Sequence, residues 1–224
     1  MARAVAINGS PQMEKGNTAL VLASFIQGMM DAGSGVELLY ASRLKVKPCS
    51  CGVMYCWNDG PGECCIQDDM QLLYPKLKAA DVLILATPVY VPLPGDMQNV
   101  VNRLMPLIEP RLERRQGRTR ARFREDVGIQ KIVLVATSGW REIENCDTVV
   151  RIVKELAEDA SVEFAGAVLR PHADAMRAGG KVTRDGQAVL DAVRKAGNEL
   201  VGQGRMSQET LAAVSRPLIP EEGP

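Results

Sequence analysis

Five of the six cysteines in this 224-residue chain lie between residues 49 and 65. They follow the pattern Cys49-x-Cys51-x4-Cys56-x7-Cys64-Cys65 in a segment rich in glycine and proline. Thiolates gathered on an irregular loop can ligate a [4Fe–4S] cluster or a zinc ion, because both accept four sulfur ligands. The alternative is a loop without metal, whose thiols stay free or act as a redox pair.

The spacing favours no single one of these possibilities. Zinc knuckles usually contain C-x2-4-C pairs, and neither Cys49/Cys51 nor Cys64/Cys65 has that spacing. Cys49, Cys51, Cys56 and Cys64 are the candidate ligands, while Cys65 either replaces a missing ligand or faces the core. The sixth cysteine, Cys146, stands beside a predicted helix start and is expected to be structural.

Composition excludes several other kinds of site. The single histidine excludes metal sites with two imidazoles and makes a histidine-centred triad a poor explanation. Lys+Arg and Asp+Glu both number 27, and zero net charge argues against nucleic acid as a partner of the whole surface. No apolar run reaches the roughly 18 residues that span a bilayer, and the first residues do not resemble a signal peptide. We therefore expect a cytoplasmic protein without a membrane partner.

The elements that must position these residues alternate along the chain. Short apolar runs predict five buried strands, at residues 3–8, 36–40, 82–86, 131–136 and 163–169. Helical periodicity predicts helices at residues 19–30, 68–77, 96–107, 148–157 and 185–201. This alternation predicts an α/β fold with a parallel sheet and helices on both of its faces.

The length suits one domain, with 46% apolar residues to fill its core. We place that domain at residues 1–202, with a cysteine-rich insertion at 48–66 and an arginine-rich segment at 110–126. Residues 203–224 form a C-terminal tail that contains three prolines and is expected to pack loosely or fray.

The loop after the first predicted strand could bind a phosphate. Ser10, Gln12, Asn17 and Thr18 offer hydroxyl and amide groups where a helix begins, and a helix N-terminus favours anions. The loop matches neither the Walker motif nor G-x-G-x-x-G, so it could equally be an ordinary strand-to-helix turn.

Two aromatic side chains follow later strands. Tyr90 comes after the third strand and Trp140 after the fourth, in a chain with only 4% aromatic residues. In a doubly wound fold these loops meet at the carboxyl ends of the strands, where ligands bind. Flat side chains there could flank a planar heteroaromatic ring, or they could cover the sheet end or an oligomer interface.

Several short motifs occur in a characteristic order. They are N-G-S-P and G-N-T within residues 8–18, D-D-M at 68–70, T-P-V-Y at 87–90, N-R at 102–103 and T-S-G at 137–139. Over residues 3–176 this combination resembles the NADPH-dependent FMN reductase and iron–sulfur flavoprotein families. The resemblance implies a flavodoxin-like, doubly wound, five-stranded parallel sheet of order 2-1-3-4-5 and a bound FMN.

The resemblance also implies roles for individual residues. The FMN phosphate would be held by Ser10, Asn17 and Thr18. The isoalloxazine ring would lie between one loop with Pro88, Val89 and Tyr90 and a second loop with Ser138 and Gly139. Relatives often have a basic residue where this chain has Gln12, so that phosphate contact is neutral here or is supplied elsewhere.

The cysteines depart from the family pattern. Iron–sulfur flavoproteins have C-x2-C-x2-C-x4-7-C at this place, and Cys56 and Cys64 agree with it. Counting back from Cys56, the other ligands would fall at Ser50 and Val53, but the thiols stand at positions 49 and 51. The [4Fe–4S] cluster, the metal-free loop and the zinc site therefore all stay open.

Residues 111–124 contain seven arginines and one glutamate. They could dock an acidic electron-transfer partner, the 2′-phosphate of NADPH or nucleic acid. Nucleic acid is the weakest of these, because Phe123 is the only aromatic residue in the run. We expect a solvated loop or a salt-bridged surface between subunits.

The resemblance implies an NAD(P)H-dependent oxidoreductase that passes electrons through FMN to a quinone or another small acceptor. No catalytic side chain is required, because the flavin carries the chemistry. A homodimer or homotetramer is expected. The alternatives are an electron carrier without enzymatic activity, serving a ferredoxin-like partner or a larger assembly, and a zinc-stabilised interaction domain without flavin.

Overall fold

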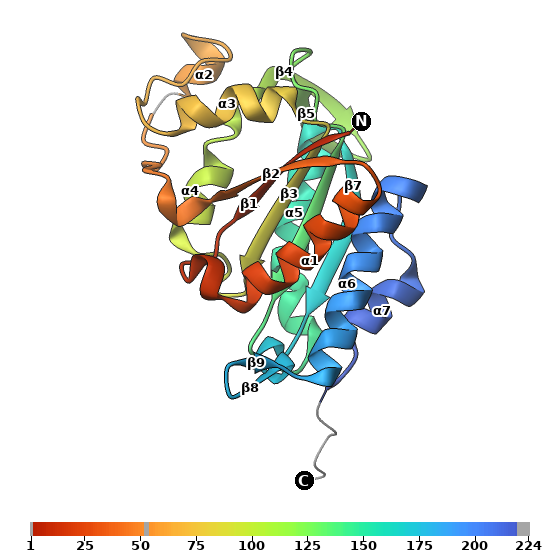
Figure 1. Cartoon of the computed structure of the whole chain (residues 1–224). Helices are drawn as coiled ribbons and strands as arrows, with labels where there is room; N and C mark the ends of the chain where they lie inside the picture. Colours follow the sequence, from red (N-terminus) through yellow and green to blue (C-terminus); the bar gives the residue numbers. More distant parts are fainter. Residues whose placement is uncertain (1, 52–53, 219–224) are drawn as a thin grey trace.

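The computed structural model describes residues 2–51 and 54–218. A five-stranded parallel sheet forms its centre, in the order β2-β1-β3-β6-β7 (Figure 1). The strands are β1 (Arg3–Asn8), β2 (Gly35–Tyr40), β3 (Val82–Pro88), β6 (Lys131–Thr137) and β7 (Glu163–Arg170). Numbered among themselves, these strands have the order 2-1-3-4-5, so the predicted flavodoxin-like fold is confirmed.

Helices cover both faces of the sheet. One face carries α1 (Asn17–Asp31) and α6 (Arg184–Gln203), and the other carries α3 (Met70–Ala79), α4 (Gly95–Asn102) and α5 (Asp147–Ala160). The side chains of a strand alternate between the two faces. In β3, Leu83 and Leu85 join the apolar cluster on the α3 side, while Val82, Ile84 and Ala86 join the cluster on the α1 side.

The cysteine-rich insertion lies between β2 and α3. It begins after a 3-10 turn at Ala41–Arg43, and its described residues include the short helix α2 (Tyr55–Asn58). Figure 1 shows α2 and α3 at the opposite end of the molecule from the small hairpin of β8 (Arg177–Ala178) and β9 (Lys181–Val182).

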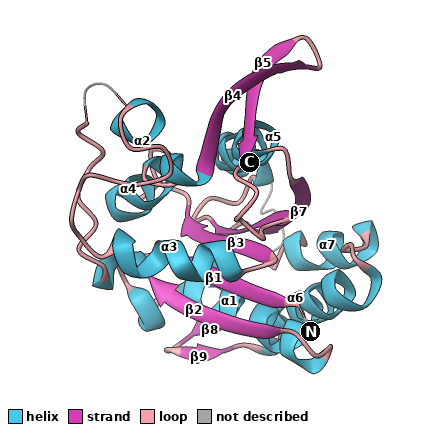
Figure 2. Ribbon diagram, turned by 90° about the horizontal axis from the view of Figure 1, so that it is seen from above, coloured by secondary structure: helices cyan, strands magenta, loops and turns pink. Residues whose placement is uncertain are grey.

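The arginine-rich segment is not a solvated loop, so that part of the expectation is wrong. It forms an antiparallel hairpin of β4 (Ile108–Arg115) and β5 (Arg118–Phe123), which projects from the body in Figure 2. Arg120 donates to Glu155, Glu158 and Asp159 of α5 at 2.7–2.8 Å. Carboxylates of the same chain thus neutralise part of the basic surface.

The tail also differs from the prediction. The last long helix continues to Gln203, and α7 (Gln208–Ser215) packs against α6 and β7 with Val214 fully buried. Buried Arg170 donates to the carbonyls of Val214 and Arg216 at 2.7 and 2.9 Å. This contact satisfies the free carbonyls at the end of α7, so the helix is fixed although proline follows it.

The helix predicted at residues 96–107 is shorter. It ends at Asn102, and a 3-10 turn at Met105–Leu107 follows because Pro106 has no backbone N–H to continue the helix. The other 3-10 turns are Met13–Lys15, Ile143–Cys146 and Ala173–Met176. No helix in the described part of the chain has the length and apolar character that crossing a membrane requires.

Candidate functional site

A cavity of about 160 Å³ lies at the carboxyl ends of β1, β3 and β6. Nine of the ten predicted cofactor residues line it: Ser10, Gln12, Asn17, Thr18, Pro88, Val89, Tyr90, Ser138 and Gly139. Four further residues complete the lining: Gly16, Thr137, Ala173 and Asp174. Four loops that are far apart in sequence, those after β1, β3, β6 and β7, thus form one site at the edge where the parallel strands end. We call this cavity the strand-end pocket.

One end of the strand-end pocket is the start of α1. Gly16 is the N-cap residue, so no side chain occupies the free N–H groups of the first turn, and that turn contains no acidic residue. Ser10 and Thr18 are buried beside it. The Thr18 hydroxyl hydrogen-bonds to that of Thr137 at 2.7 Å, and Ser10 Oγ accepts from the Gln12 N–H at 3.3 Å. The combination is suited to binding an anion.

Charged side chains near this end were missed by the sequence analysis. Asn17 Nδ2 donates to Asp174 Oδ1 at 2.6 Å, so an exposed carboxylate lies beside the anion site. Arg177 Nη1 lies 3.4 Å from the carbonyl of Lys15, just before α1, and Arg177 Nε is buried without a hydrogen-bond partner in the described structure. Both residues follow the fifth strand of the sheet. The loop after this strand reaches the same sheet edge as the other loops of the pocket. The place of these two residues in the sequence, directly after a strand, could therefore have indicated that they lie near the site.

The other end of the strand-end pocket is formed by the loops after β3 and β6. The loops after β3 and β6 are joined by a hydrogen bond from Val89 N to Thr137 O at 2.8 Å. A Cβ added at Gly139 would meet only Asp174 Oδ2, at 4.0 Å, so glycine leaves open space there. Tyr90 lines the pocket and is 50% exposed.

Trp140 is the one predicted cofactor residue that does not line the pocket. Its backbone is fixed at the rim, because its N–H donates to Ser138 Oγ at 3.0 Å and its carbonyl accepts from the His172 N–H at 2.6 Å. Its side chain is 67% exposed.

The cysteine insertion brings two of its sulfur atoms into contact. Cys49 Sγ and Cys51 Sγ are 3.8 Å apart. Burial raises the pKa of Cys56 to about 11, and negative charge on Cys51, Cys64 and Cys49 adds to the effect. Cys65 is exposed, and Cys146 is fully buried elsewhere in the core, as expected for a structural cysteine. Ser50 is described, whereas Val53 lies outside the described residues.

The sulfurs are not arranged around a single ion. Among the described residues, no three His, Cys, Asp or Glu side chains are grouped closely enough to hold one. Ligands of a [4Fe–4S] cluster bind separate iron atoms at the corners of a cube, so their sulfurs stand farther apart than the ligands of one metal ion.

A buried ion pair closes the base of the insertion. Arg103 and Asp68 are 1% and 2% exposed, and Arg103 makes two hydrogen bonds to the Asp68 carboxylate, at 2.7 and 3.0 Å. The same guanidinium donates to the carbonyls of Lys47 and Ile66, which stand on either side of the cysteines. The D-D-M and N-R motifs therefore meet in space.

Burial alone would raise the pKa of Asp68. Hydrogen bonds from Arg103 and from the N–H groups of Lys47 and Met70 outweigh that effect, so the pKa of Asp68 is lowered. The carboxylate consequently stays ionised opposite Arg103.

Helix α4 connects the two sites. It begins after the loop of Pro88, Val89 and Tyr90 and ends beside Arg103. Its eight residues span roughly 12 Å at about 1.5 Å per residue. Of the described cysteines, none lines the strand-end pocket.

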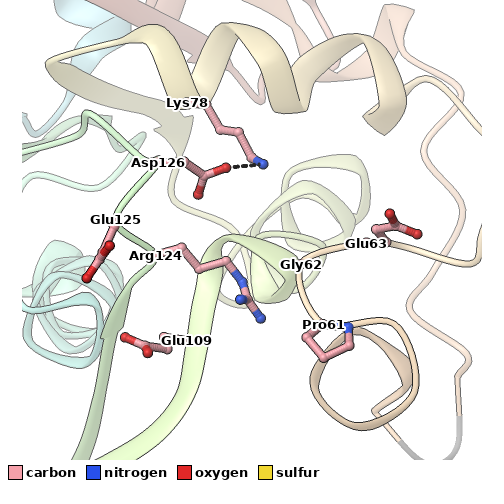
Figure 3. Close-up of a pocket in the computed structure, with 8 residues that line it drawn as sticks. All are labelled: Pro61, Gly62, Glu63, Lys78, Glu109, Arg124, Glu125 and Asp126. Atoms are coloured by element: carbon pink, nitrogen blue, oxygen red, sulfur yellow. Dashed lines mark hydrogen bonds and ion pairs between the residues drawn. The ribbon is translucent and has the colours of Figure 1, made fainter.

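A second cavity, of about 480 Å³, borders the insertion (Figure 3). Four carboxylates line it, those of Glu63, Glu109, Glu125 and Asp126, against two cations, Lys78 and Arg124. Because carboxylates outnumber cations in its lining, this cavity is poorly suited to binding a phosphate.

Arg124 fixes the insertion at the wall of this second cavity. Its Nε donates to the Pro106 carbonyl at 3.0 Å. Its guanidinium packs on Gly62, where an added Cβ would lie 3.2 Å from Nε. The insertion is therefore held at a second point besides its base.

Comparison with known sequences agrees with the motifs. Residues 2–142 match the family of NADPH-dependent FMN reductases. An iron–sulfur flavoprotein of Archaeoglobus fulgidus is 32% identical over 106 residues, which are 46% of each chain. An iron–sulfur flavoprotein of Methanocaldococcus jannaschii is 33% identical over 88 residues, 39% of this chain and 44% of the relative. The chain thus aligns with less than half the length of these curated relatives.

Solved structures share the fold at low sequence identity. The NAD(P)H:quinone oxidoreductase from Methanothermobacter marburgensis has a TM-score of 0.58 at 17% identity, over 89% of this chain and 96% of that one. An FMN-dependent NADH-azoreductase from Bacillus anthracis, in complex with FMN, has a TM-score of 0.60 at 13% identity, over 91% and 99%. The family match covers more than half of the chain, so this protein belongs to the NADPH-dependent FMN reductase family.

Proposed function

We propose that this protein is an oxidoreductase that binds FMN in the strand-end pocket and uses NAD(P)H as its electron donor. The observation that carries the proposal is that three separate loops bring nine predicted cofactor residues to one cavity beside an open helix N-terminus. Bound FMN would supply the hydride and electron chemistry, with a quinone or another small molecule as acceptor.

Different residues of the pocket would bind different parts of the cofactor. The first turn of α1, with Ser10, Asn17 and Thr18, would hold the phosphate. Tyr90 and the glycine surface at Gly139 would flank the ring, and stacking on an aromatic side chain contributes about 1 kcal/mol. No side chain of the pocket needs to transfer a proton.

A second copy of the chain would cover the exposed rim. Val91 is 99% exposed, and Trp140 and Tyr90 are largely exposed beside the pocket. Apolar side chains grouped at a ligand site are typical of interfaces. We therefore propose a homodimer or homotetramer, which sedimentation analysis of the FMN-loaded protein would detect.

We also propose that Cys49, Cys51, Cys56 and Cys64 hold a [4Fe–4S] cluster. The contact between Cys49 Sγ and Cys51 Sγ and the placement of all four thiols in one insertion support it, and the curated iron–sulfur flavoproteins align with this chain. Anaerobic purification followed by iron, sulfide and zinc analysis tests this. About four iron and four sulfide per chain would support the cluster. Zinc, or no metal after reconstitution, would contradict it.

Anaerobic rapid mixing tests the reductase. FMN-loaded protein is mixed with NADH or NADPH, and the loss of flavin absorbance is followed before a quinone is added. Reduction by a pyridine nucleotide and reoxidation by the quinone support the proposal. Failure with both nucleotides, together with rapid reduction by a reduced ferredoxin, would instead identify an electron carrier.

A further inference from the structure

Strand β4 is the outer strand of the β4–β5 hairpin. The hairpin projects from the body of the molecule (Figure 2), and in the described part of the chain no third strand pairs with it. β5 lies against α5, to which Arg120 is bound by ion pairs. β4 contacts α2, but its Pro110, Arg111 and Leu112 are exposed. An exposed strand edge offers unpaired N–H and C=O groups to another strand.

Leu112 stands near the middle of β4 and is 57% exposed. One exposed leucine would need no explanation, but charged residues surround this one. Arg111 and Arg114 are both exposed, and the ion pairs of β4 in the described structure belong to Glu113 and Arg115. The order of these charges along β4 indicates what could cover the edge.

The charges of β4 are complementary to those of a second β4 turned about Leu112. In an antiparallel pair, one step toward the start of one strand faces one step toward the end of the other. With the two copies of Leu112 face to face, Arg111 of each copy lies opposite Glu113 of the other. Farther out, Glu109 lies opposite Arg115. Opposite charges directly across from each other stabilise a strand pair.

The neighbouring symmetric registers place like charges together. A two-fold axis at Arg111 would set that arginine against its own copy and Glu109 against Glu113. An axis at Glu113 would set this glutamate against its own copy and Arg111 against Arg115. Like charges directly opposite each other destabilise a strand pair. Charge therefore selects Leu112 as the position of the axis.

Pro110 limits the length of such a pairing. It has no N–H to donate, and the register of β4 with β5 shifts between Glu109 and Glu113. Prolines and bulges on an edge strand keep it from pairing without limit. The contact is consequently short and centred on Leu112.

We propose that β4 is an interface with a second copy of this chain, in which the two hairpins lie edge to edge and antiparallel with Leu112 at the two-fold axis. Each copy contributes the same residues to a two-fold contact, so the pair of Arg111 with Glu113 occurs twice.

This interface is separate from the contact proposed at the pocket rim. Figure 1 shows β4 and β5 at the opposite end of the molecule from β8 and β9, which follow the pocket residue Asp174. The two contacts together would make a tetramer, and the hairpin contact alone a dimer.

Cysteine cross-linking tests the position of the axis. A residue at a two-fold axis faces its own copy, so Leu112→Cys in the full-length protein should form a disulfide-linked dimer under mild oxidation. Thr119→Cys is the matched control, because Thr119 is exposed on β5 of the same hairpin. Wild-type protein reports any linkage through the insertion cysteines. We expect several-fold more linked dimer in Leu112→Cys than in either control.

Two charge reversals test the register. Arg111→Glu places a carboxylate opposite Glu113 at both symmetric positions, so the dissociation constant of the contact, measured by sedimentation, should rise roughly tenfold. Arg114→Glu is the matched control, because Arg114 is also exposed on β4 but would face Pro110 of the other copy. It should change the constant little. Urea unfolding should be the same for both variants as for wild type, because exposed positions contribute little to the fold.

Linked dimer no more abundant in Leu112→Cys than in the controls would overturn the inference, and so would equal weakening by the two charge reversals. If wild-type protein still sediments as an oligomer in that case, the pocket-rim contact stands. Wild-type protein that is monomeric at every concentration would overturn both contacts. These measurements do not depend on flavin, so failure of the FMN site would leave the inference in place.

Discussion

Thr18 contributes to the strand-end pocket through its buried hydroxyl and through its backbone N–H in the first turn of α1. The hydroxyl is 2.7 Å from that of Thr137, so one of the two can donate to the other and leave a hydrogen for a ligand. Valine has nearly the same shape as threonine but no hydroxyl, and this makes the contribution measurable.

We expect Thr18→Val and Ser10→Ala each to weaken FMN binding about tenfold. A hydrogen bond to a charged group contributes about 1.5–3 kcal/mol, and about 1.4 kcal/mol corresponds to a factor of ten. Quenching of flavin fluorescence measures the affinity. Ser215→Ala on α7 is the control, because its hydroxyl bonds only to carbonyls of its own helix. Unchanged affinity in both pocket variants would contradict the assignment of the phosphate.

Removing the charge of Asp174 should strengthen FMN binding, whereas the Thr18 and Ser10 variants should weaken it. The Asp174 carboxylate binds the Asn17 amide at 2.6 Å and would repel a phosphate at the start of α1. Asp174→Asn should bind FMN a few-fold more tightly, since exposed charge pairs are worth up to about 1 kcal/mol. The gain should shrink at high salt because exposed charges are screened. Asp191→Asn, an exposed carboxylate on α6, should have no effect, and equal gains in both variants would contradict the account.

Sequence reasoning located most of the pocket because strand ends must meet at one edge of a parallel sheet. Ser10, Thr18, Tyr90 and Gly139 could be placed in this way. Asp174 could not, because its approach to Asn17 depends on how the chain turns after β7. The pairing of Asp68 with Arg103 was missed for a similar reason, since 35 residues separate them and only packing brings them together.

The β4–β5 hairpin was not predicted from the sequence, because its strands lie within a run of charged residues. Its arginines occupy every second position of β5, so they share one face of the strand, and both Arg118 and Arg120 pair with Glu155 of α5. Composition indicated a charged surface, but the register that pairs the run with α5 is a tertiary property. The prediction of a surface salt-bridged between subunits stays untested.

The ion pairs between the hairpin and α5 should make the free energy of unfolding decrease as the pH falls into the acid range. Hydrogen bonds from Arg120, and also from Arg151 and Arg118, lower the pKa of Glu155 from 4.5 to about 2. A lowered pKa in the folded state stabilises the protein above the ordinary pKa, and this contribution is lost as the pH falls through the folded value. Urea unfolding should therefore show Glu155→Gln less stable than wild type at neutral pH, with the difference closing between about pH 4.5 and pH 2.

Glu144→Gln is the control for this titration, since Glu144 makes no ion pair within the described residues. It should follow the wild-type curve at every pH. A constant difference between Glu155→Gln and wild type down to pH 2 would show that the ion pairs do not stabilise the fold.

Buried Arg170 holds the end of α7, while buried Glu199 of α6 accepts hydrogen bonds from Ser207 and Thr210 at its start. Burial lowers the pKa of Arg170 to about 10, and the nearby Arg216 cation adds to this, so it stays charged at neutral pH and donates to the end of α7. Arg170→Met should lower the free energy of unfolding by about 3 kcal/mol, the scale of charged hydrogen bonds. It should also expose α7 to proteases. Arg216→Met, which removes a half-exposed side chain, should cost little, and equal losses would contradict this account.

At the scale of the whole molecule, two sites lie at opposite ends of α4. The alternation of apolar strands and helices was enough to predict a parallel sheet covered by helices on both faces, whereas the order of its strands was implied by the family resemblance. It could not predict that the insertion is fixed by Arg103 and Arg124, or that the tail folds as α7. Those features depend on single buried contacts rather than on periodic patterns.

The central claim is that the strand-end pocket recognises FMN through its phosphate at the start of α1. Riboflavin has the same ring without the phosphate, so its affinity relative to FMN tests the claim most directly. Fluorescence titration of the apo protein should show FMN bound roughly 100-fold more tightly than riboflavin, about 2.7 kcal/mol. The difference in affinity between FMN and riboflavin should be smaller in Thr18→Val. Equal affinity for the two flavins, or no binding of either, would contradict the account.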